Sequence, residues 1–123
     1  MITPYLIYKD DPSAEVWIDQ AISKEHSSLL TEDLKAVVNN PAGSGYAAHR
    51  TDMELAGKTG TAELKSEQGT TGQEIGWFSV FTTDPSASKP VLLTSMVESV
   101  EDKGGSTYVV KKDAAVLDSY FGS

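Results

Sequence analysis

Two neighbouring segments, residues 75–82 and 90–99, constrain the fold of this chain more than any other feature. In both segments, odd-numbered and even-numbered positions alike carry apolar side chains. Side chains alternate between the two faces of a β-strand, so each segment is apolar on both faces. Strands of this kind are usually buried on both sides. We therefore expect helices to cover both faces of a sheet that contains these two segments.

A third strand is expected at residues 55–64, directly before these two. A turn around Gly69–Gly72 joins it to the first of them, and short connections between strands favour antiparallel hairpins. A separate hairpin is expected near the N-terminus. There, residues 3–8 read as a strand, and residues 15–18 return as a second short strand after a polar turn.

Two further segments have the periodicity of amphipathic helices. The first begins at Ser23, a favourable N-cap residue, and is stopped by Asn39, Asn40 and Pro41. A terminal helix is expected to begin with Ser106 as its cap. The apolar stripes of the two helices are Leu30, Leu34, Val37 and Val38 in the first and Val110, Ala114, Leu117 and Phe121 in the second. The order of elements predicts an α+β fold, with an antiparallel sheet of at least three strands and helices packed on it.

Composition excludes several classes of function. The chain has 123 residues, which corresponds to one short domain. Its net charge of −8 disfavours nucleic-acid binding, which needs clustered Lys and Arg. No apolar run reaches the about 20 residues of a membrane span, so we expect a soluble chain without membrane contact. Cysteine is absent, which excludes disulfides, thiolate zinc sites and a Cys nucleophile.

The segment Gly57-Lys58-Thr59-Gly60-Thr61 has the residue types of a carboxylate-binding strand. It combines a fixed cation, two hydroxyls and glycines that let another backbone approach closely. On a strand, Lys58 and Gly60 share one face, and Thr59 and Thr61 share the other. If the strand borders a cleft, its free backbone groups can pair with an extended peptide. Taken alone, Lys-Thr-Gly also fits an ordinary edge strand with a solvated Lys.

Lys-Thr-Gly is one of three sequence signatures of penicillin-binding proteins and class A β-lactamases. Here it is followed by a Gly76-Trp77-Phe78 strand, an apolar strand, a turn at 102–104 and a terminal helix. This succession resembles the C-terminal part of the transpeptidase domain of class B penicillin-binding proteins, and most closely the low-affinity, β-lactam-resistant type. The resemblance covers nearly all of residues 1–121 and is most specific at 55–65 and 74–81. It implies the transpeptidase fold that this family shares with serine β-lactamases.

The resemblance also implies a role in peptidoglycan synthesis. In that family a Ser attacks the D-alanyl-D-alanine bond of a stem peptide, and an amine from a second peptide resolves the acyl-enzyme; β-lactams acylate the same Ser. By resemblance, Lys58, Thr59, Gly60 and Thr61 would bind the substrate or β-lactam carboxylate. The backbone N–H of Thr61 would be one donor of the oxyanion hole. No cofactor or metal is implied, and the parent protein would be anchored in the membrane with its domain outside.

Two of the family's three motifs are missing from this chain. Neither Asn39 nor Asn40 follows a Ser at the spacing of Ser-x-Asn, and no other Asn occurs. The one Ser-x-x-Lys runs from Ser86 to Lys89, between two prolines and after Lys-Thr-Gly. A nucleophile needs a rigid helix start and a base held against it, so we reject Ser86 as a catalytic residue. We expect residues 1–123 to be the C-terminal portion of a transpeptidase domain, inactive alone because the nucleophile lies elsewhere.

Other functions and partners were weighed against this one. A free-standing module could capture peptides by adding them to a sheet edge, or the chain could be an inert structural domain. His26 and His49 have no second ligand at metal-binding spacing. If strand 90–99 lies at a sheet edge, it carries no charge between Lys89 and Glu98 to protect it. We therefore expect self-association through this strand.

Overall fold

The computed structural model describes residues 1–2, 15–65, 72–84 and 86–122. The chain divides into two compact units, Met1–Leu30 and Thr31–Ser123. In the first unit, Ile2 and Val16 form an antiparallel bridge, and the N-terminal ammonium donates a 2.7 Å hydrogen bond to the carbonyl of Ile18. This bridge has the direction that the predicted N-terminal hairpin requires. Residues 3–14, which make up most of that hairpin, lie outside the described residues.

Helix α1 spans Lys24–Asn39 and so continues from one unit into the other. The hydroxyl of Ser23 accepts a 3.1 Å hydrogen bond from the backbone N–H of His26, which confirms Ser23 as the N-cap. The helix ends at Asn39, as predicted. Its apolar stripe is buried only toward the C-terminal end, since Val38 is fully buried whereas Leu30 is exposed.

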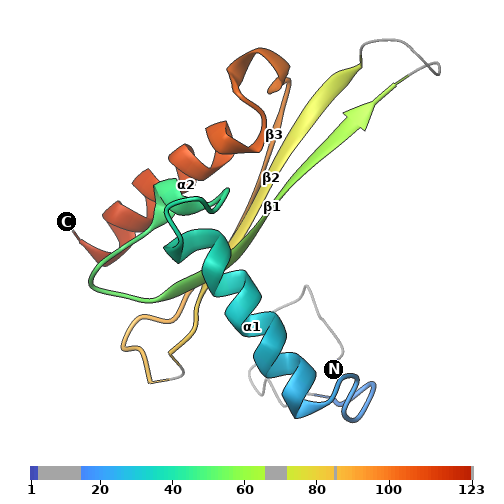
Figure 1. The fold of residues 1–123 in the computed structure, drawn as a ribbon, viewed down its shortest axis with the longest axis vertical. Helices are drawn as coiled ribbons and strands as arrows, with labels where there is room; N and C mark the ends of the chain where they lie inside the picture. The colour runs from blue at the N-terminus through green and yellow to red at the C-terminus, as the bar shows by residue number, and fades with distance from the viewer. Residues whose placement is uncertain (3–14, 66–71, 85, 123) are drawn as a thin grey trace. The chain divides into compact units, whose positions relative to one another are not determined.

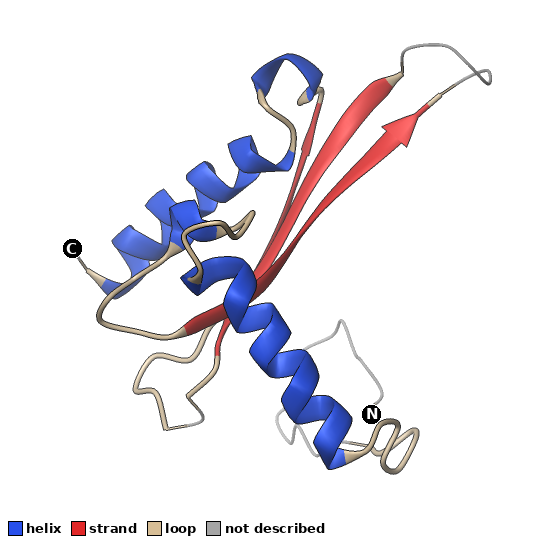
Figure 2. Ribbon diagram, in the orientation of Figure 1, coloured by secondary structure: helices blue, strands red, loops and turns tan. Residues whose placement is uncertain are grey.

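Three strands form one antiparallel sheet in the order β1-β2-β3 (Figure 1). They span Leu55–Leu64, Gln73–Thr82 and Leu92–Glu98, within two residues of the predicted bounds at each end. Together with the helices they give the predicted α+β class (Figure 2). A short 3-10 helix, η1, spans Tyr46–Ala48 in the loop before β1.

Helix α2 spans Ser106–Phe121 and packs along the sheet. Its N-cap is Gly105, so the predicted cap at Ser106 is wrong by one residue. Gly104 and Gly105 have φ angles of 92° and 63°, and only glycine adopts this left-handed backbone readily. The core joins α2 to the sheet, η1 and the end of α1. It comprises Val38, Ala48, Leu55, Phe78, Val80, Val109, Val110 and Leu117.

The two faces of the sheet differ in what covers them. The strand register defines a covered face, which carries Leu55, Gly57, Thr59, Thr61, Gly76, Phe78, Val80, Leu93, Ser95 and Val97. It also defines an open face, which carries Lys58, Gly60, Ile75, Trp77, Ser79, Phe81, Leu92, Thr94 and Met96. Helix α2 packs on the covered face, where Val109 and Asp113 reach Gly76 and Ser95.

The expectation that helices cover both faces is therefore wrong for the described residues. On the open face, Trp77 is 41% exposed, Met96 46% and Leu92 71%. Among the described residues of this face only Ala56 is fully buried, and it pairs with Phe81, which is half-buried. The described helices supply that cover on one side only.

Candidate functional site

The strand that carries Lys58-Thr59-Gly60-Thr61 is an edge strand of the described sheet. β1 pairs with β2 alone, so its other edge carries backbone groups without a partner strand. Such an edge is a template for pairing with an extended peptide. The edge position by itself fits both a peptide-binding strand and the ordinary edge strand with a solvated Lys that the sequence left open.

The register also confirms the predicted division of the motif between two faces. Lys58 pairs with Ser79 and Gly60 with Trp77 on the open face, whereas Thr59 pairs with Phe78 on the covered face. The Lys58 ammonium is exposed and donates a 2.6 Å hydrogen bond to the carbonyl of Thr59. Among the described residues, no carboxylate forms an ion pair with Lys58.

A hydroxyl that the sequence analysis missed lies beside the motif. Ser44 Oγ is 2.7 Å from Thr59 Oγ1, so the two hydroxyls form one hydrogen-bonded pair. The loop that holds Ser44 is tight: Gly45 donates a 2.9 Å backbone hydrogen bond to Val37 at the end of α1. A Cβ on Gly43 would lie 2.3 Å from the carbonyl oxygen of Val37, so this position needs glycine. The Gly-Ser-Gly sequence was the signal that could have pointed to this residue.

Thr61 lies where β1 meets the start of α2. It pairs with Gly76, and a Cβ on Gly105 would lie 3.8 Å from Thr61 Oγ1. The turn before α2 thus borders the far end of the motif. The four predicted site residues therefore lie on one strand, bordered by the Ser44 loop near Thr59 and by the α2 turn near Thr61.

Comparison with known proteins decides the family. A family model of the penicillin-binding protein transpeptidase domain matches residues 1–117. This chain belongs to that family. It is 42% identical over 113 residues to penicillin-binding protein 3 of Bacillus subtilis, a match that covers 91% of this chain and 16% of that protein. The chain thus spans less than a fifth of the relative's length.

A solved structure supports the same fold. The apo transpeptidase domain of Burkholderia pseudomallei penicillin-binding protein 3 matches with a TM-score of 0.65 and 19% sequence identity. The match covers 92% of this chain and 34% of that chain. The predicted α+β transpeptidase fold is confirmed, and the described chain corresponds to about a third of such a domain.

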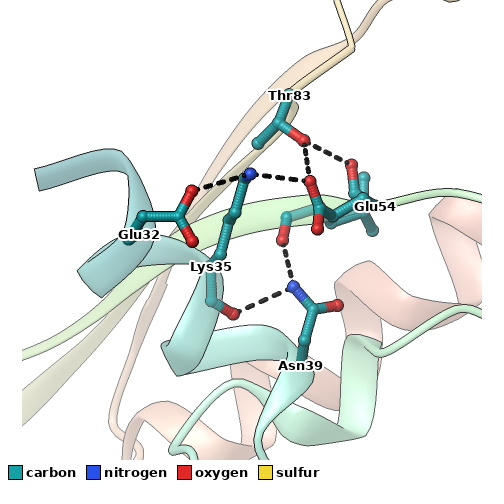
Figure 3. A network of polar contacts seen from close by, with 6 residues as sticks. Glu32, Lys35, Asn39, Glu54 and Thr83 are labelled. Carbon is teal, nitrogen blue, oxygen red and sulfur yellow. Dashed lines mark hydrogen bonds and ion pairs between the residues drawn. The ribbon is translucent and has the colours of Figure 1, made fainter. Parts of the chain in front are cut away.

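A polar network fixes the start of β1, the strand that carries Lys58 (Figure 3). The Lys35 ammonium lies 2.9 Å from a Glu54 carboxylate oxygen and 3.0 Å from one of Glu32. Thr83 donates a 2.9 Å hydrogen bond to the same Glu54 oxygen. Bonds from Lys35 and Thr83 lower the pKa of Glu54, and bonds to Glu54 and Glu32 raise the pKa of Lys35. The carboxylate directly before β1 is thereby held in its ionised form.

Asn39 completes this attachment. Its side-chain amide donates 2.9 Å and 2.8 Å hydrogen bonds to the carbonyls of Lys35 and Leu55, and thus joins the end of α1 to the start of β1 (Figure 3). Its oxygen lies 3.1 Å from Nδ1 of His49, which stacks on Tyr46. His49 therefore takes part in a structural contact of the transpeptidase chain.

Arg50 attaches the far end of α2 to the loop before β1, and we call this set of contacts the Arg50 clamp. The guanidinium of Arg50 donates to both carboxylate oxygens of Asp52, to Asp118 and to the carbonyl of Gly122. The same group lies over the ring of Phe121, 5.2 Å from its centroid. The hydrogen bonds from Arg50 hold the pKa of Asp52 below its usual value. This clamp ties the loop before β1 to the helix that covers the sheet.

In the described structure, Lys89 of the Ser-x-x-Lys sequence forms no hydrogen bond with Ser86. Its hydroxyl donates a 2.7 Å hydrogen bond to Asp84, while the Lys89 ammonium points to the carbonyl of Tyr120 at 3.4 Å. In the part of the chain that the structure describes, no three His, Asp or Glu side chains lie close enough to share a metal ion. No described helix is both long and apolar enough to span a membrane.

Proposed function

We propose that this chain supplies one wall of the active site of a D,D-transpeptidase. The parent enzyme would cross-link peptidoglycan stem peptides through an acyl-serine intermediate and would be the target of β-lactams. One observation carries the proposal: in a chain of the transpeptidase family, Lys58 lies on an edge strand with an ammonium that no described carboxylate neutralises. An anionic group that docks against this edge would gain a charge-assisted contact.

Each residue of the motif receives a role in this proposal. Lys58 and the hydroxyls of Thr59 and Thr61 would hold the terminal carboxylate of the peptide or the drug, and Gly60 would let it approach the strand. The Ser44 hydroxyl, which shares a hydrogen bond with Thr59, would help to orient this group. The backbone N–H of Thr61 would be one oxyanion-hole donor, because a strand holds such donors in place before charge develops.

The catalytic Ser and its Lys would come from another part of the parent protein. Support comes from the comparisons, since the chain matches 16% of its B. subtilis relative and 34% of the solved transpeptidase domain. Within residues 1–123 we assign the C-terminal portion of the domain, with no catalytic activity of its own. The parent would be anchored in the membrane, work outside it and belong to the low-affinity, β-lactam-resistant type.

A second candidate function follows from the free edge of β1. A stand-alone module could bind an extended peptide by strand addition at that edge, without any covalent step. We further propose that the chain self-associates through strand 90–99, because β3 also has one strand partner only in the described sheet.

Labelling by fluorescent penicillin tests the main proposal. The 123-residue chain should give no covalent band on a denaturing gel, because it holds no activated Ser. In the full-length parent, Lys58→Ala should slow acylation about 10- to 150-fold, the equivalent of the ~1.5–3 kcal/mol of a hydrogen bond to a charged group. Its melting temperature should hardly change, since surface substitutions usually alter stability by less than about 0.5 kcal/mol.

Lys111→Ala is the matched control, because Lys111 is an exposed lysine on α2. It should leave the acylation rate unchanged. A covalent label mapped to Ser86, or an acylation rate that Lys58→Ala does not alter, would contradict the assignment. Peptide binding to the isolated chain, with no acylation in the parent, would favour the strand-addition module instead.

A further inference from the structure

Asp113 is the one charged residue among the described residues whose side chain lies in the core. It is 3% exposed and lies on the side of α2 that faces the sheet. One carboxylate oxygen accepts a 2.7 Å hydrogen bond from the hydroxyl of Ser95 on β3. The other oxygen is buried and has no hydrogen-bond partner. None of the ion pairs between described residues includes Asp113.

The elements packed against Asp113 offer it no compensating charge. On the covered face, the middle of each strand carries uncharged residues, and Glu63 and Glu74 pair with each other at the far end. Phe78 is the cross-strand neighbour of Ser95, and Glu74 lies four residues before Phe78. Four residues of extended strand place Glu74 about 13 Å from Phe78. In η1 the one titratable group is the exposed Tyr46. Within α2, the nearest turns place Val109, Val110 and Leu117 beside it.

An ionised carboxylate in such surroundings lowers the free energy of unfolding. Burying a charge without a counter-charge is far more unfavourable than burying a neutral carboxylic acid. Accordingly, burial raises the pKa of Asp113 above its ordinary value of 3.8, and the hydrogen bond from Ser95 lowers it by less. The neutral acid is the form that this site accommodates best.

We propose that the buried packing of Asp113 against β3 is a proton-dependent latch between α2 and the sheet. It is tightest when the Asp113 carboxyl is protonated and loosens when the carboxyl ionises, because the hydrogen bond from Ser95 offsets only part of the cost of a buried charge. The latch lies midway along α2, between the Gly105 turn that borders Thr61 and the Arg50 clamp at the other end. Loosening it would therefore weaken the support beneath the strand that carries the Lys-Thr-Gly motif. This inference concerns the fold of the chain and does not depend on the proposed enzymatic function.

The direction of the pH dependence follows from the raised pKa. Below the ordinary pKa of 3.8, folded and unfolded chains are both protonated at this residue, and the latch stabilises fully. As the pH rises, the unfolded chain loses its proton first, and this stabilisation is lost up to the folded-state pKa. A folded-state pKa one unit higher makes the folding equilibrium constant about tenfold smaller above both values.

Two measurements on the 123-residue chain test the latch. Carbon-13 NMR of the carboxyl groups should show Asp113 titrating above the ordinary Asp range, and Ser95→Ala should move its midpoint further up. Melting curves of wild type and Asp113→Asn should be compared between pH 4 and 8. As the pH rises, the melting temperature of wild type should fall relative to that of Asp113→Asn, by about 4–8 °C for each tenfold decrease in the folding equilibrium constant. Asp33→Asn, which removes an exposed carboxylate, is the control and should follow wild type.

An Asp113 carboxyl that titrates at or below the ordinary Asp range would overturn the proposal. So would a melting-temperature difference between wild type and Asp113→Asn that is the same at every pH. If Asp113→Asn does not fold, the carboxyl titrations of wild type and Ser95→Ala decide the matter, because they need no substitution at Asp113. A midpoint that falls in Ser95→Ala would also refute the latch.

Discussion

The covered and open faces of the sheet both carry large apolar side chains but are buried to very different extents. On the same strand, Phe78 is completely buried beneath α2, whereas its neighbour Trp77 on the open face is 41% exposed. Val80 is buried like Phe78, and Met96 is exposed like Trp77. Both faces carry large apolar side chains, so the difference lies in what the described elements cover. Helix α2 packs on one face, and the described elements leave Trp77, Leu92 and Met96 of the other face exposed.

This contrast predicts that removing an aromatic side chain matters far more on the covered face. Phe78→Ala leaves a cavity among Val80, Val109 and the Gly45 loop, and buried Phe→Ala changes usually cost about 3–5 kcal/mol of the free energy of unfolding. Trp77→Ala removes a side chain that is already partly in water, so its cost should be clearly smaller. Urea unfolding followed by circular dichroism measures both values.

Equal losses for the two variants would mean that the open face is covered in solution. A small loss for Phe78→Ala would show that α2 does not pack as described. Either result would remove the distinction between the faces.

The sequence predicted the strands well because their signals are local. The segments near 55–64, 75–82 and 90–99 combine β-forming residues with turn residues at their ends, and the observed bounds agree within two residues at each end. Ser23 acts as a helix cap for the same reason, since its hydroxyl bonds within one turn. Lys58 and Thr59 could be assigned to opposite faces because alternation along a strand is a property of the backbone.

Features that depend on tertiary contacts were not predictable in this way. Whether Trp77 is covered depends on elements far along the chain or outside it. The pairing of Ser44 with Thr59 joins residues 15 positions apart and depends on how the Gly-Ser-Gly loop folds back. Asp113 is a charged residue, a type that is usually exposed, yet α2 docks with its Asp113 side toward Ser95.

Adding a Cβ at a glycine on each face should change the stability by an intermediate amount and should again distinguish the two faces. A Cβ on Gly76, on the covered face, would lie 2.8 Å from Val109 Cγ2 and 3.2 Å from Val100 Cγ2. Overpacking of this kind usually costs about 1–3 kcal/mol, so Gly76→Ala should lower the melting temperature clearly. A Cβ on Gly60, on the open face, would meet only Trp77 Cβ at 3.5 Å, an ordinary contact.

Gly60→Ala is thus the matched control for Gly76→Ala. It should leave the stability unchanged or raise it slightly, because alanine restricts the unfolded chain more than glycine does. The two melting temperatures can be compared by calorimetry at one pH. If Gly60→Ala were the more damaging change, the open face would have to be packed against another layer.

The smallest effect on stability, and the most direct test of the open face, comes from adding a charge to it. Met96 and Leu92 are exposed apolar residues on β3, whose outer edge pairs with no other described strand. We expect two copies to pair through this edge and face, with the net charge of −8 limiting the assembly to small oligomers. Met96→Lys should shift sedimentation toward monomer, while the free energy of unfolding of the monomer changes by only about ±0.5 kcal/mol.

Val116→Lys is the control, since Val116 is equally exposed but lies on α2 away from the sheet, and it should leave the oligomer intact. A wild-type chain that sediments as a monomer at high concentration would mean that this sheet face does not pair with a second copy.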